Sequence, residues 1–313
     1  MNATNVIVVG AGLAGISCAR ELVRSGFSAA LLDKGRGIGG RMATRRVTLD
    51  AGTISFDHGA QYLPVTDGDF AQVIRAASWQ AWPSADALVG VPGMSSLPRT
   101  LAGGLNISQK VEVTGLEQDG GSWHLTGPAG EITAPRVVLA IPAPQVMRLL
   151  GDAHPLSDAL SSVVMSPCLT LMAAFPAESR RPFSHRLDPG HPLVWVAQDS
   201  SKPGRSTAAV TWVAQAGPEF SAMHLEETPQ AIAALMLPLL CDVIGAEADK
   251  VLHAQAHRWR YAHASQPLGR PFLRTRAGSL YVGGDWCLGS RAEHAWQSGQ
   301  AIARDIIRHA DVV

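Results

Sequence analysis

The feature that most constrains the fold is a glycine-rich turn that follows an apolar run early in the sequence. Residues 6–15 read VIVVGAGLAG, so a β-type run breaks into the spacing Gly-x-Gly-x-x-Gly. Asp33 follows the last of these glycines by 18 positions, at the end of a second apolar run over 29–32. A strand, a glycine turn that opens a helix and an acid about 20 residues on form a dinucleotide-binding fingerprint. The pattern predicts a parallel α/β sheet with a helix over about 13–25.

Each residue of the fingerprint has a physical role. We expect Gly10 to permit the tight turn, Gly12 to let the backbone approach a pyrophosphate, and Gly15 to let helix and strand pack closely. The helix would direct its unpaired N–H groups at the diphosphate. Asp33 can accept hydrogen bonds from both hydroxyls of an adenosine ribose. The Gly-Gly-Arg triplet at 39–41 favours FAD over NAD, and its arginine can donate to the diphosphate. The alternative is a glycine-rich turn in another kind of α/β protein.

Composition narrows the class of protein. The chain has 313 residues, of which 46% are hydrophobic and 17% charged, and its formal net charge is zero. These values indicate neither a basic footprint for nucleic acid nor a polybasic membrane patch. The first residues lack the cationic region of a signal peptide, and no apolar run is long enough to span a bilayer. We therefore expect a cytoplasmic protein. The four cysteines are scattered without a CxxC pair, so neither a zinc site nor a disulfide framework is expected.

Patterning predicts the remaining elements. Alternation between glycine turns predicts a small antiparallel meander over 105–131, followed by a strand over 137–141. Apolar runs predict three strands of a second sheet within 168–213, and a helix over 228–243 with Pro229 near its first turn. The last predicted elements are a strand over 280–282, the turn Gly283-Gly284-Asp285 and a helix that ends near 309.

These elements predict two interleaved domains. The FAD-binding domain would comprise 1–64, 99–154 and 271–313. The substrate-binding domain would comprise 65–98 and 155–270 and would lie over the flavin. Ligands commonly bind in clefts between domains, so the substrate is expected there.

Several longer motifs carry a family resemblance. They are DKGRGIGGRM (33–42), DHGAQY (57–62), PGMSSL (92–97), VVLAIPAPQ (137–145), SKPGR (201–205), AHRWRYA (256–262) and GGDWCLGSRAEHAWQSG (283–299). Over nearly its whole length the chain resembles the flavin amine oxidase superfamily, and within it the renalase-like branch. The resemblance implies a Rossmann-type FAD-binding domain of the glutathione-reductase kind, with a β-meander, interleaved with a mixed α+β substrate domain. The stretch from Trp82 to Pro92 is shorter than in the related chains, which changes the expected rim of the pocket.

The fingerprint and the resemblance together predict the cofactor-binding residues. Asp285 would accept a hydroxyl of the ribityl chain, and the helix that starts near 291–293 would stabilise the reduced flavin through its dipole. Val113 would hold the adenine through its backbone. The full set is Gly10, Ala11, Gly12, Leu13, Ala14, Gly15, Asp33, Lys34, Gly40, Arg41, Asp57, His58, Val113, Gly284, Asp285 and Glu293.

The resemblance also predicts which residues face the pocket. The segment at 57–62 would run past the flavin ring, so His58, Gln61 and Tyr62 are the candidate catalytic residues. The candidate substrate-binding residues are Gly59, Ala60, Trp195, Trp212, His257, Trp286 and His294, and Trp259 and Tyr261 are further pocket-facing candidates. Each has a structural alternative: the tryptophans lie in apolar runs where core packing is equally expected, and His257 and Trp259 fit one face of an ordinary strand.

The implied activity is oxidation of 2- or 6-dihydro isomers of NAD(P)H to NAD(P)⁺, with O₂ reduced to hydrogen peroxide. A dihydropyridine is already a hydride donor, so the cofactor carries the chemistry and no general base is needed. None of the four lysines lies on a predicted strand over the ring, and Cys287 is out of register for covalent attachment, so noncovalent FAD is expected. The alternatives are an amine oxidase and a flavoprotein without turnover. No nucleic acid or membrane partner is expected.

Overall fold

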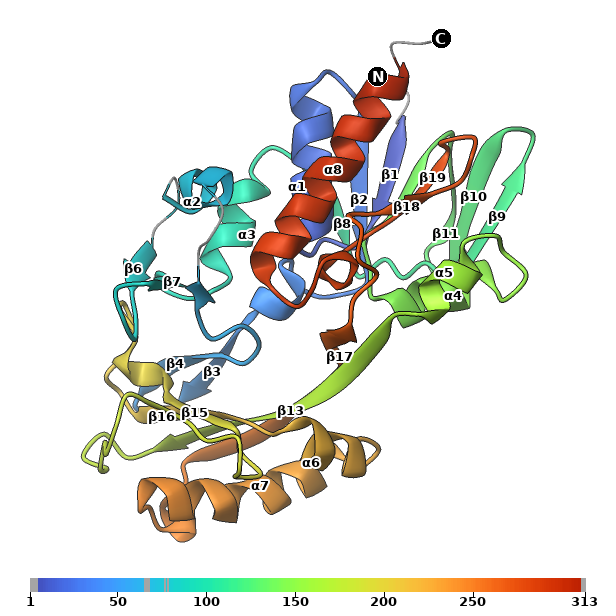
Figure 1. Cartoon of the computed structure of the whole chain (residues 1–313). Helices are drawn as coiled ribbons and strands as arrows, with labels where there is room; N and C mark the ends of the chain where they lie inside the picture. Colours follow the sequence, from blue (N-terminus) through green and yellow to red (C-terminus); the bar gives the residue numbers. More distant parts are fainter. Residues whose placement is uncertain (1–4, 65–67, 76, 78, 311–313) are drawn as a thin grey trace. The chain divides into compact units, whose positions relative to one another are not determined.

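The computed structural model describes residues 5–64, 68–75, 77 and 79–310 (Figure 1). The chain forms two compact units, and each unit is assembled from separate stretches of sequence. The first unit comprises Met1–Gly40, Pro98–Met165 and His263–Val313. The second comprises Arg41–Leu97 and Ser166–Ala262. None of the helices in the described ranges combines the length and the apolar character that a membrane crossing requires.

A six-stranded sheet forms the centre of the first unit. Its order is β18 (Leu273–Arg274), β19 (Leu280–Val282), β12 (Val137–Leu139), β1 (Val6–Val9), β2 (Ala29–Asp33) and β8 (Asn106–Gln109). All neighbours are parallel except β18, which runs antiparallel to β19. All four residues of β1 are buried, as is typical of a parallel strand covered on both faces. The predicted Rossmann-type fold is confirmed.

Helices α1 (Leu13–Arg24) and α8 (Ala292–Ala310) pack side by side against this sheet (Figure 1). Their backbones approach closely at Gly299, where an added Cβ would lie 2.2 Å from the carbonyl oxygen of Ala14. Ser17 donates a hydrogen bond of 3.0 Å to the carbonyl of Trp296, which fixes the register of the two helices. The shorter helices of the unit are α4 (Ala143–Leu150) and α5 (Ser157–Ser161).

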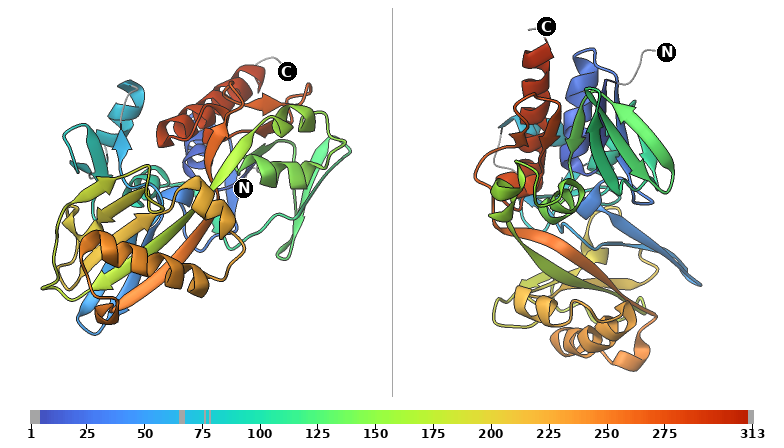
Figure 2. Two further views of the ribbon diagram at one scale, coloured as in Figure 1. Left: turned by 60° about the horizontal axis from the view of Figure 1, so that its bottom comes forward. Right: turned by 90° about the vertical axis from the view of Figure 1, so that its right-hand side faces the viewer.

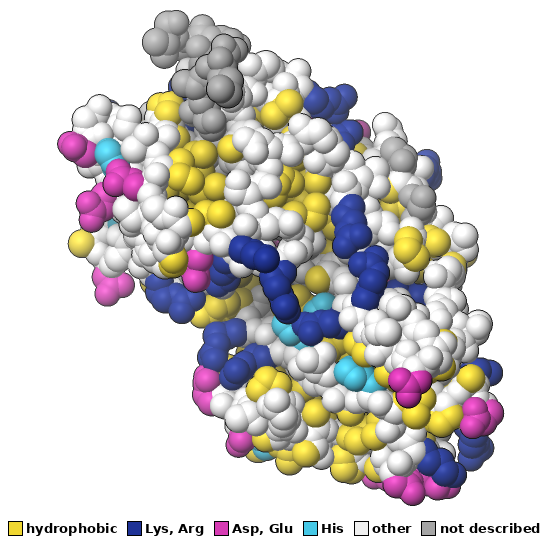
Figure 3. Space-filling view, turned by 180° about the vertical axis from the view of Figure 1, so that it is seen from behind, with side chains coloured by type: hydrophobic (Ala, Val, Ile, Leu, Met, Phe, Trp, Pro, Cys, Tyr) yellow, Lys and Arg dark blue, Asp and Glu magenta, His cyan; other side chains and the backbone are white. Residues whose placement is uncertain are grey.

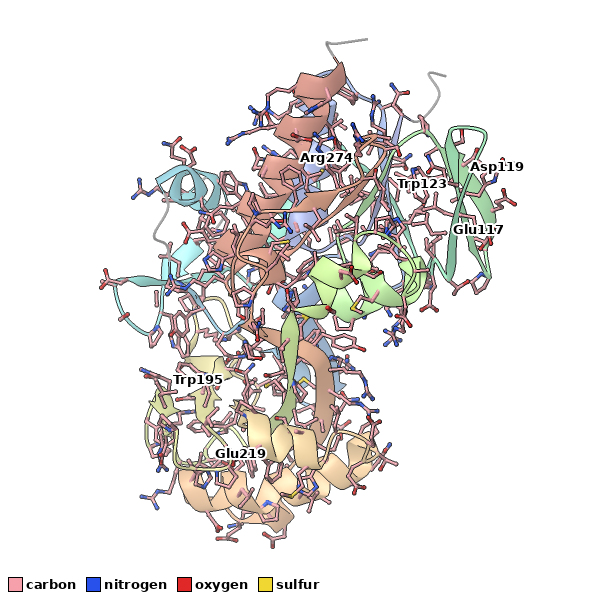
Figure 4. All side chains as sticks on the ribbon, turned by 45° about the vertical axis from the view of Figure 1, so that its right-hand side comes forward. Glu117, Asp119, Trp123, Trp195, Glu219 and Arg274 are labelled. Carbon is pink, nitrogen blue, oxygen red and sulfur yellow. The ribbon has the colours of Figure 1, made fainter. Side chains whose placement is uncertain are left out.

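The meander of the first unit is shorter than expected. It contains β9 (Gly115–Asp119), β10 (Ser122–Gly127) and β11 (Gly130–Ala134). Trp123 points into the core, whereas Glu117 and Asp119 are exposed (Figure 4). The start of the predicted meander at 105 is wrong, because Asn106–Gln109 form the edge strand β8 beside β2. An edge strand is exposed along much of its length, so its sequence looks like that of a meander strand.

A five-stranded sheet forms the centre of the second unit. Its order is β14 (His185–Leu187), β15 (Trp195–Gln198), β16 (Val210–Gln215), β13 (Val164–Phe175) and β17 (His253–Gln266). Helices α6 (Pro218–Met223) and α7 (Pro229–Ile244) cover one face, which Figure 2 shows from a second side. Thr228 caps α7 by accepting from the N–H of Ala231 at 3.2 Å. The predicted strands and helix of this region are confirmed.

The opposite face of this sheet carries the hairpin of β3 (Thr44–Leu49) and β4 (Gly52–Asp57). Ile54 and Phe56 of β4 pack there against Met172 and Val213. The other elements are a small sheet of β5 (Leu63–Pro64), β7 (Ala87–Gly90) and β6 (Trp79–Ala81), the helices α2 (Gly68–Arg75) and α3 (Ser96–Leu101), and single 3₁₀ turns at Gly40–Met42, Asp199–Ser201, Ala248–Lys250 and Asp285–Cys287.

The compact units and the expected functional domains have different boundaries. The expected FAD-binding domain includes residues 41–64, which the structure packs into the second unit. The functional division stays a prediction, because compactness does not say which residues contact a ligand. The expected ranges also include 1–4, 65–67, 76, 78 and 311–313, which lie outside the described residues. The face drawn in Figure 3 carries both basic and acidic side chains.

Candidate functional site

The three glycines of the fingerprint serve different purposes. Gly10 has a φ of +105°, and a Cβ there would lie 2.5 Å from the carbonyl oxygen of Ala140. A Cβ on Gly15 would lie 1.9 Å from the carbonyl oxygen of Gly10. The fold itself therefore requires both of these glycines. A Cβ on Gly12 would meet no protein atom within 4 Å, so the space beside Gly12 is open to a ligand.

The N-terminus of α1 lies at this open space. Gly12 is the N-cap and has no side chain that could cap the helix, and the first turn contains no acidic residue. Leu13 and Ala14 are nevertheless buried there. A buried helix N-terminus with free N–H groups is a ready site for an anion. The loop after β2 closes over the turn, since the N–H of Gly39 donates to the carbonyl of Ala11 at 2.8 Å and a Cβ on Gly40 would lie 3.6 Å from the Cα of Gly12.

The carboxylate of Asp33 is held by two backbone donors. Its Oδ2 accepts from the N–H of Ala11 and its Oδ1 from the N–H of Gly35, each at 2.6 Å. Each oxygen keeps a further lone pair that can accept from a hydroxyl. The predicted contact with a ribose is thus compatible with the structure, and the carboxylate is already oriented before a ligand binds. Lys34 beside it is half-exposed and lies 3.7 Å from Glu112.

A small pocket opens beside the end of β2. Its lining includes Leu32, Val113 and Gly127. The backbones are close here, because a Cβ on Gly127 would lie 2.0 Å from the carbonyl oxygen of Glu112. The recess holds about 20 Å³, which is roughly the room of one water molecule. The contact of Val113 with an adenine, which the family resemblance implies, stays a prediction.

The C-terminal glycine turn places Asp285 directly after strand β19 in the sequence. Gly284 donates its N–H to Ser298 Oγ at 3.0 Å, and Trp286 packs over Gly284. Asp285 and Glu293 are buried, at 5% and 2% exposure. Carboxylates are almost never this buried without a polar role. Their contacts with a cofactor stay predictions.

The structure places two predicted substrate residues in the first unit. Trp286 is buried in its apolar core and donates from Nε1 to the carbonyl of Ile141 at 3.0 Å. It supports the C-terminal glycine turn by packing, which is the structural alternative. His294 is half-buried near Gly289, and burial lowers its pKa.

The first unit as a whole fits a dinucleotide. The supporting features are the open space at Gly12, the uncapped helix N-terminus and the oriented Asp33. Within the described ranges, no group of three or more His, Cys, Asp or Glu side chains could hold a metal ion.

In the second unit, the sheet face opposite α7 carries other residues that were predicted to face the substrate. Side chains alternate along a strand, and Val196 and Ala256 point into the core below α7. Their neighbours Trp195 and His257 therefore point to the opposite face. Figure 4 labels Trp195 on this sheet and Glu219 on α6. Trp212 points into the α7 core with no exposure, and its ring lies 5.2 Å from that of Phe183. The prediction that Trp212 binds substrate is wrong, because its position along β16 gives it the core face.

The segment 57–62 crosses the face that carries Trp195 and His257. Its backbone is tied down by side chains from three sources. Trp259 Nε1 donates to the carbonyl of His58 at 2.8 Å, and Gln215 Nε2 donates to that of Gly59 at 2.7 Å. Gln61 Nε2 donates to the carbonyls of Asp57 and Gly59. An irregular segment with its carbonyls bonded in this way is rigid, which is what a site residue requires of its support.

Two aromatic groups lie along this segment. The ring of His58 lies 4.8 Å from that of His257 and 5.2 Å from that of Trp259. The ring of Tyr62 lies 5.7 Å from that of Trp195. Among the described residues, His58 Nδ1 and Trp195 Nε1 have no hydrogen-bond partner. Trp212 Nε1, which lies in the core, has no partner either, so an unpartnered nitrogen does not by itself mark a ligand contact.

The two histidines of the first group are neutral. Burial, followed by His257 and Arg45, lowers the pKa of His58 to about 3. Burial, followed by Arg45, lowers the pKa of His257 to about 4. Imidazoles with such low pKa values accept protons poorly at neutral pH. The group is therefore an uncharged aromatic surface rather than a source of general-base catalysis.

These shifts predict an acid-sensitive fold. The folded pKa values lie below the unfolded value of about 6.5, so unfolding takes up protons below that pH. Stability should be full above pH 6.5 and should fall toward pH 4, by at most about 1.4 kcal/mol per pH unit for His58 and by less for the more exposed His257. Urea unfolding of wild type and His58→Phe at several pH values measures this. Equal slopes in the two proteins would contradict the pKa shift of His58.

A buried charged cluster supports the same segment. It comprises Asp57, Asp199, Lys202 and Arg205, whose side chains are at most 2% exposed. Lys202 Nζ lies 2.8 Å from Asp199 and 3.3 Å from Asp57, and Arg205 contacts both acids. Asp57 Oδ1 also accepts from Thr44 Oγ1 at 2.7 Å and from the N–H of Met94 at 3.0 Å. The carboxylate of Asp57 has no exposed surface and belongs to the charged cluster, and the cofactor contact of Asp57 stays a prediction.

Sequence reasoning missed the three partners of Asp57. Lys202 was considered only as one of the lysines that lie off the predicted strands over the ring, and Asp199 and Arg205 were not singled out. The signal that could have found them is the SKPGR motif, which contains two cations within a region of apolar strands. Arg41, which was expected to reach a diphosphate, donates from Nη1 to the carbonyl of Ala262 at 2.7 Å. Its cofactor contact stays a prediction.

Gly59 has no room for a side chain. A Cβ there would lie 2.0 Å from the carbonyl oxygen of Arg41, an oxygen that also accepts from the N–H of Ala60 at 2.8 Å. Gly59→Ala should therefore displace the segment and cost about 1–3 kcal/mol of unfolding free energy, as overpacking generally does. Gly68→Ala is the matched control, since a Cβ at Gly68 meets nothing within 4 Å. Equal urea midpoints for the two variants would contradict the prediction.

Known proteins share this architecture. The structure is similar, at 12% identity and a TM-score of 0.77, to a candidate protoporphyrinogen oxidase from Exiguobacterium sp. 255-15, covering 99% of this chain and 100% of that one. It is also similar to cyclohexylamine oxidase from Brevibacterium oxydans IH-35A (13% identity, TM-score 0.76, 98% and 99% covered). A third similar structure is wild-type putrescine oxidase bound to putrescine (14% identity, TM-score 0.73, 97% and 99% covered). At these identities the likeness shows the fold.

The sequence itself matches two family descriptions. Residues 8–77 match the NAD(P)-binding Rossmann-like domain, in agreement with the dinucleotide site of the first unit. Residues 83–307 match the flavin containing amine oxidoreductases, and this match covers most of the chain. The chain therefore belongs to the flavin containing amine oxidoreductase family, a family of flavin-dependent oxidoreductases.

Proposed function

We propose that the protein is an FAD-dependent oxidase of the renalase-like branch, which converts 2- or 6-dihydro isomers of NAD(P)H to NAD(P)⁺. In the overall reaction the dihydropyridine gives up a hydride, and O₂ with one further proton becomes H₂O₂. The observation that carries the proposal is the uncharged aromatic surface of His58, His257 and Trp259, on which a nicotinamide ring can stack.

The chemistry of the substrate matches that surface. A dihydropyridine needs no deprotonation before it loses a hydride, and His58 and His257 are poor bases at neutral pH because burial lowers their pKa values to about 3 and 4. The flavin, when bound, accepts the hydride and passes the electrons to O₂. The residues of the second unit would stack against the ring, exclude water and orient the carboxamide toward unpartnered atoms such as Trp195 Nε1.

Oxidation of an amine is the second candidate. Two of the similar structures are amine oxidases, which favours it. The lysines of this chain argue against a lysine-held water beside the flavin. Lys34 and Lys250 are more than half exposed and lie beside glutamates, and Lys110 is exposed. The ammonium of Lys202 is enclosed by two aspartates. We therefore place dihydropyridine oxidation first.

We also infer that the FAD is held without a covalent bond. Cys287 is fully buried in the core of the first unit. Burial raises the pKa of its thiol to about 12, and the nucleophilic thiolate is then scarce at neutral pH. Acid precipitation should release all of the yellow chromophore. Colour that stays on the pellet would show a covalent flavin.

Anaerobic mixing separates the candidates. We expect 2-dihydroNAD to bleach the flavin absorption, with a rate nearly constant between about pH 6 and 9 because no base takes part. Reduction by simple amines, with a rate that rises with pH through the pKa of an amine, would support the second candidate. Bleaching by neither donor would indicate a flavoprotein without turnover. A steep ionisation that disappears on replacing His58 or Tyr62 would show a general base and contradict the hydride mechanism.

A further inference from the structure

Lys202 makes contacts that its role in a charge pair does not require. The buried charged cluster balances two aspartates with Lys202 and Arg205. Lys202 Nζ also lies 3.4 Å from Gln61 Oε1, and it lies 5.0 Å from the centroid of the Trp82 ring. Arg205 instead donates from Nη1 to Ser55 Oγ, at 2.8 Å. Lys202 therefore contacts the segment 57–62 at a second residue besides Asp57.

The contact with Lys202 fixes the orientation of the Gln61 amide. An ammonium only donates hydrogen bonds, so the oxygen of the amide must face Lys202. The carbonyls of Asp57 and Gly59 only accept, so the amide nitrogen must face them, and Gln61 Nε2 contacts both. The side chain is 6% exposed and both of its amide protons are used. Gln61, a candidate catalytic residue, therefore uses its amide within its own segment.

We propose that Lys202 is a positioning residue for the oxidation. Through Gln61, Lys202 holds the backbone between Asp57 and Gly59, which carries the ring of His58. Tyr62 directly follows Gln61 in the chain, so the same contact restrains its position. The proposal deepens the proposed function and rests on it. The substrate class is the dihydropyridine of the proposed function, which the rings of His58 and Tyr62 would contact. Lys202 itself touches no substrate.

Charge balance and positioning can be separated by substitution. Lys202→Met alone would leave two buried carboxylates with one cation, so its effect would mix both roles. The double variant Lys202→Met with Asp199→Asn keeps one acid and one cation, Asp57 and Arg205, which already contact each other. Asp199 Oδ1 accepts from the N–H of Asp57 at 3.4 Å, and the amide oxygen of the substituted side chain can still do so. This variant removes the contact to Gln61 and preserves neutrality.

Gln61→Met tests the other end of the same contact. It removes the amide and leaves all four members of the charged cluster in place. We expect both the double variant and Gln61→Met to keep wild-type FAD content, and to slow flavin reduction at saturating donor by about 10- to 100-fold through lost orientation. Because both act through one contact, the triple variant should be no slower than either. Additive losses would show that Lys202 and Gln61 act independently and would overturn the proposal.

The remaining outcomes are also decisive. A double variant that reduces flavin at the wild-type rate would show that Lys202 only balances charge. If the double variant does not fold, Gln61→Met still tests the proposal, because a wild-type reduction rate there overturns it. The rates are measured with whichever donor bleaches the wild-type flavin. A wild type that reacts with amines and not with 2-dihydroNAD defeats the proposed function, whereas a reactive wild type with unaffected variants defeats the role of Lys202.

Discussion

Gly12→Ala is expected to lose FAD while the apoprotein stays folded. Gly12 has φ −75° and ψ 179°, a backbone conformation open to alanine, and a Cβ there would meet no protein atom within 4 Å. The added methyl group would project into the space where the N–H groups of α1 face a diphosphate. Loss of one or two charge-assisted hydrogen bonds, each about 1.5–3 kcal/mol, should weaken FAD binding roughly 100-fold or more.

The measurement compares FAD affinity with the stability of the apoprotein. Fluorescence titration gives the Kd for FAD, and urea unfolding of flavin-free protein gives the stability, which should change by less than about 1 kcal/mol for alanine at an N-cap. Gly15→Ala is the contrasting variant. Its Cβ would lie 1.9 Å from the carbonyl oxygen of Gly10, so it should destabilise the apoprotein itself. If Gly12→Ala binds FAD with the wild-type Kd, the diphosphate does not bind at this turn.

Arg205→Met should destabilise the second unit more than any surface substitution. Arg205 contacts both buried aspartates and is 2% exposed, so its loss leaves Asp57 and Asp199 with Lys202 alone. Breaking a buried ion pair by removing one partner typically costs about 3–5 kcal/mol, because the remaining charge is buried without compensation. The expected result is a large fall in the urea midpoint, with the loss relieved at lower pH where a carboxylate can take up a proton.

The matched control for this variant is Arg46→Met. Arg46 lies on β3 beside the same hairpin but is exposed. Its replacement should change the unfolding free energy by no more than about 0.5 kcal/mol. Similar midpoints for the two variants would show that the cluster adds little to stability. A fall in Arg205→Met that is the same at every pH would point to lost packing rather than to unbalanced charge.

The sequence predicted local features well at positions where only one residue type fits. The turn at Gly10 and Gly15 is an example, because the close approaches there exclude any side chain, and the strand and helix on either side follow from it. Asp33 was expected to meet a ribose, but its two backbone donors could not be predicted, since they depend on how the loop to Gly40 folds back. The edge strand β8 was misassigned because its exposure pattern is also that of a meander strand.

The sequence by itself determined the Rossmann-type fold, the dinucleotide fingerprint and the family. These depend on short-range residue spacing, and few structures are compatible with that spacing. The tertiary structure decided which face Trp195 and Trp212 occupy, since β16 is buried on both sides and only strand pairing selects the face. It also brought Lys202 to Asp57, a contact between residues 145 positions apart. No local sequence pattern predicts a contact between charges so far apart in the chain. They pair because the fold buries both of them at the same place.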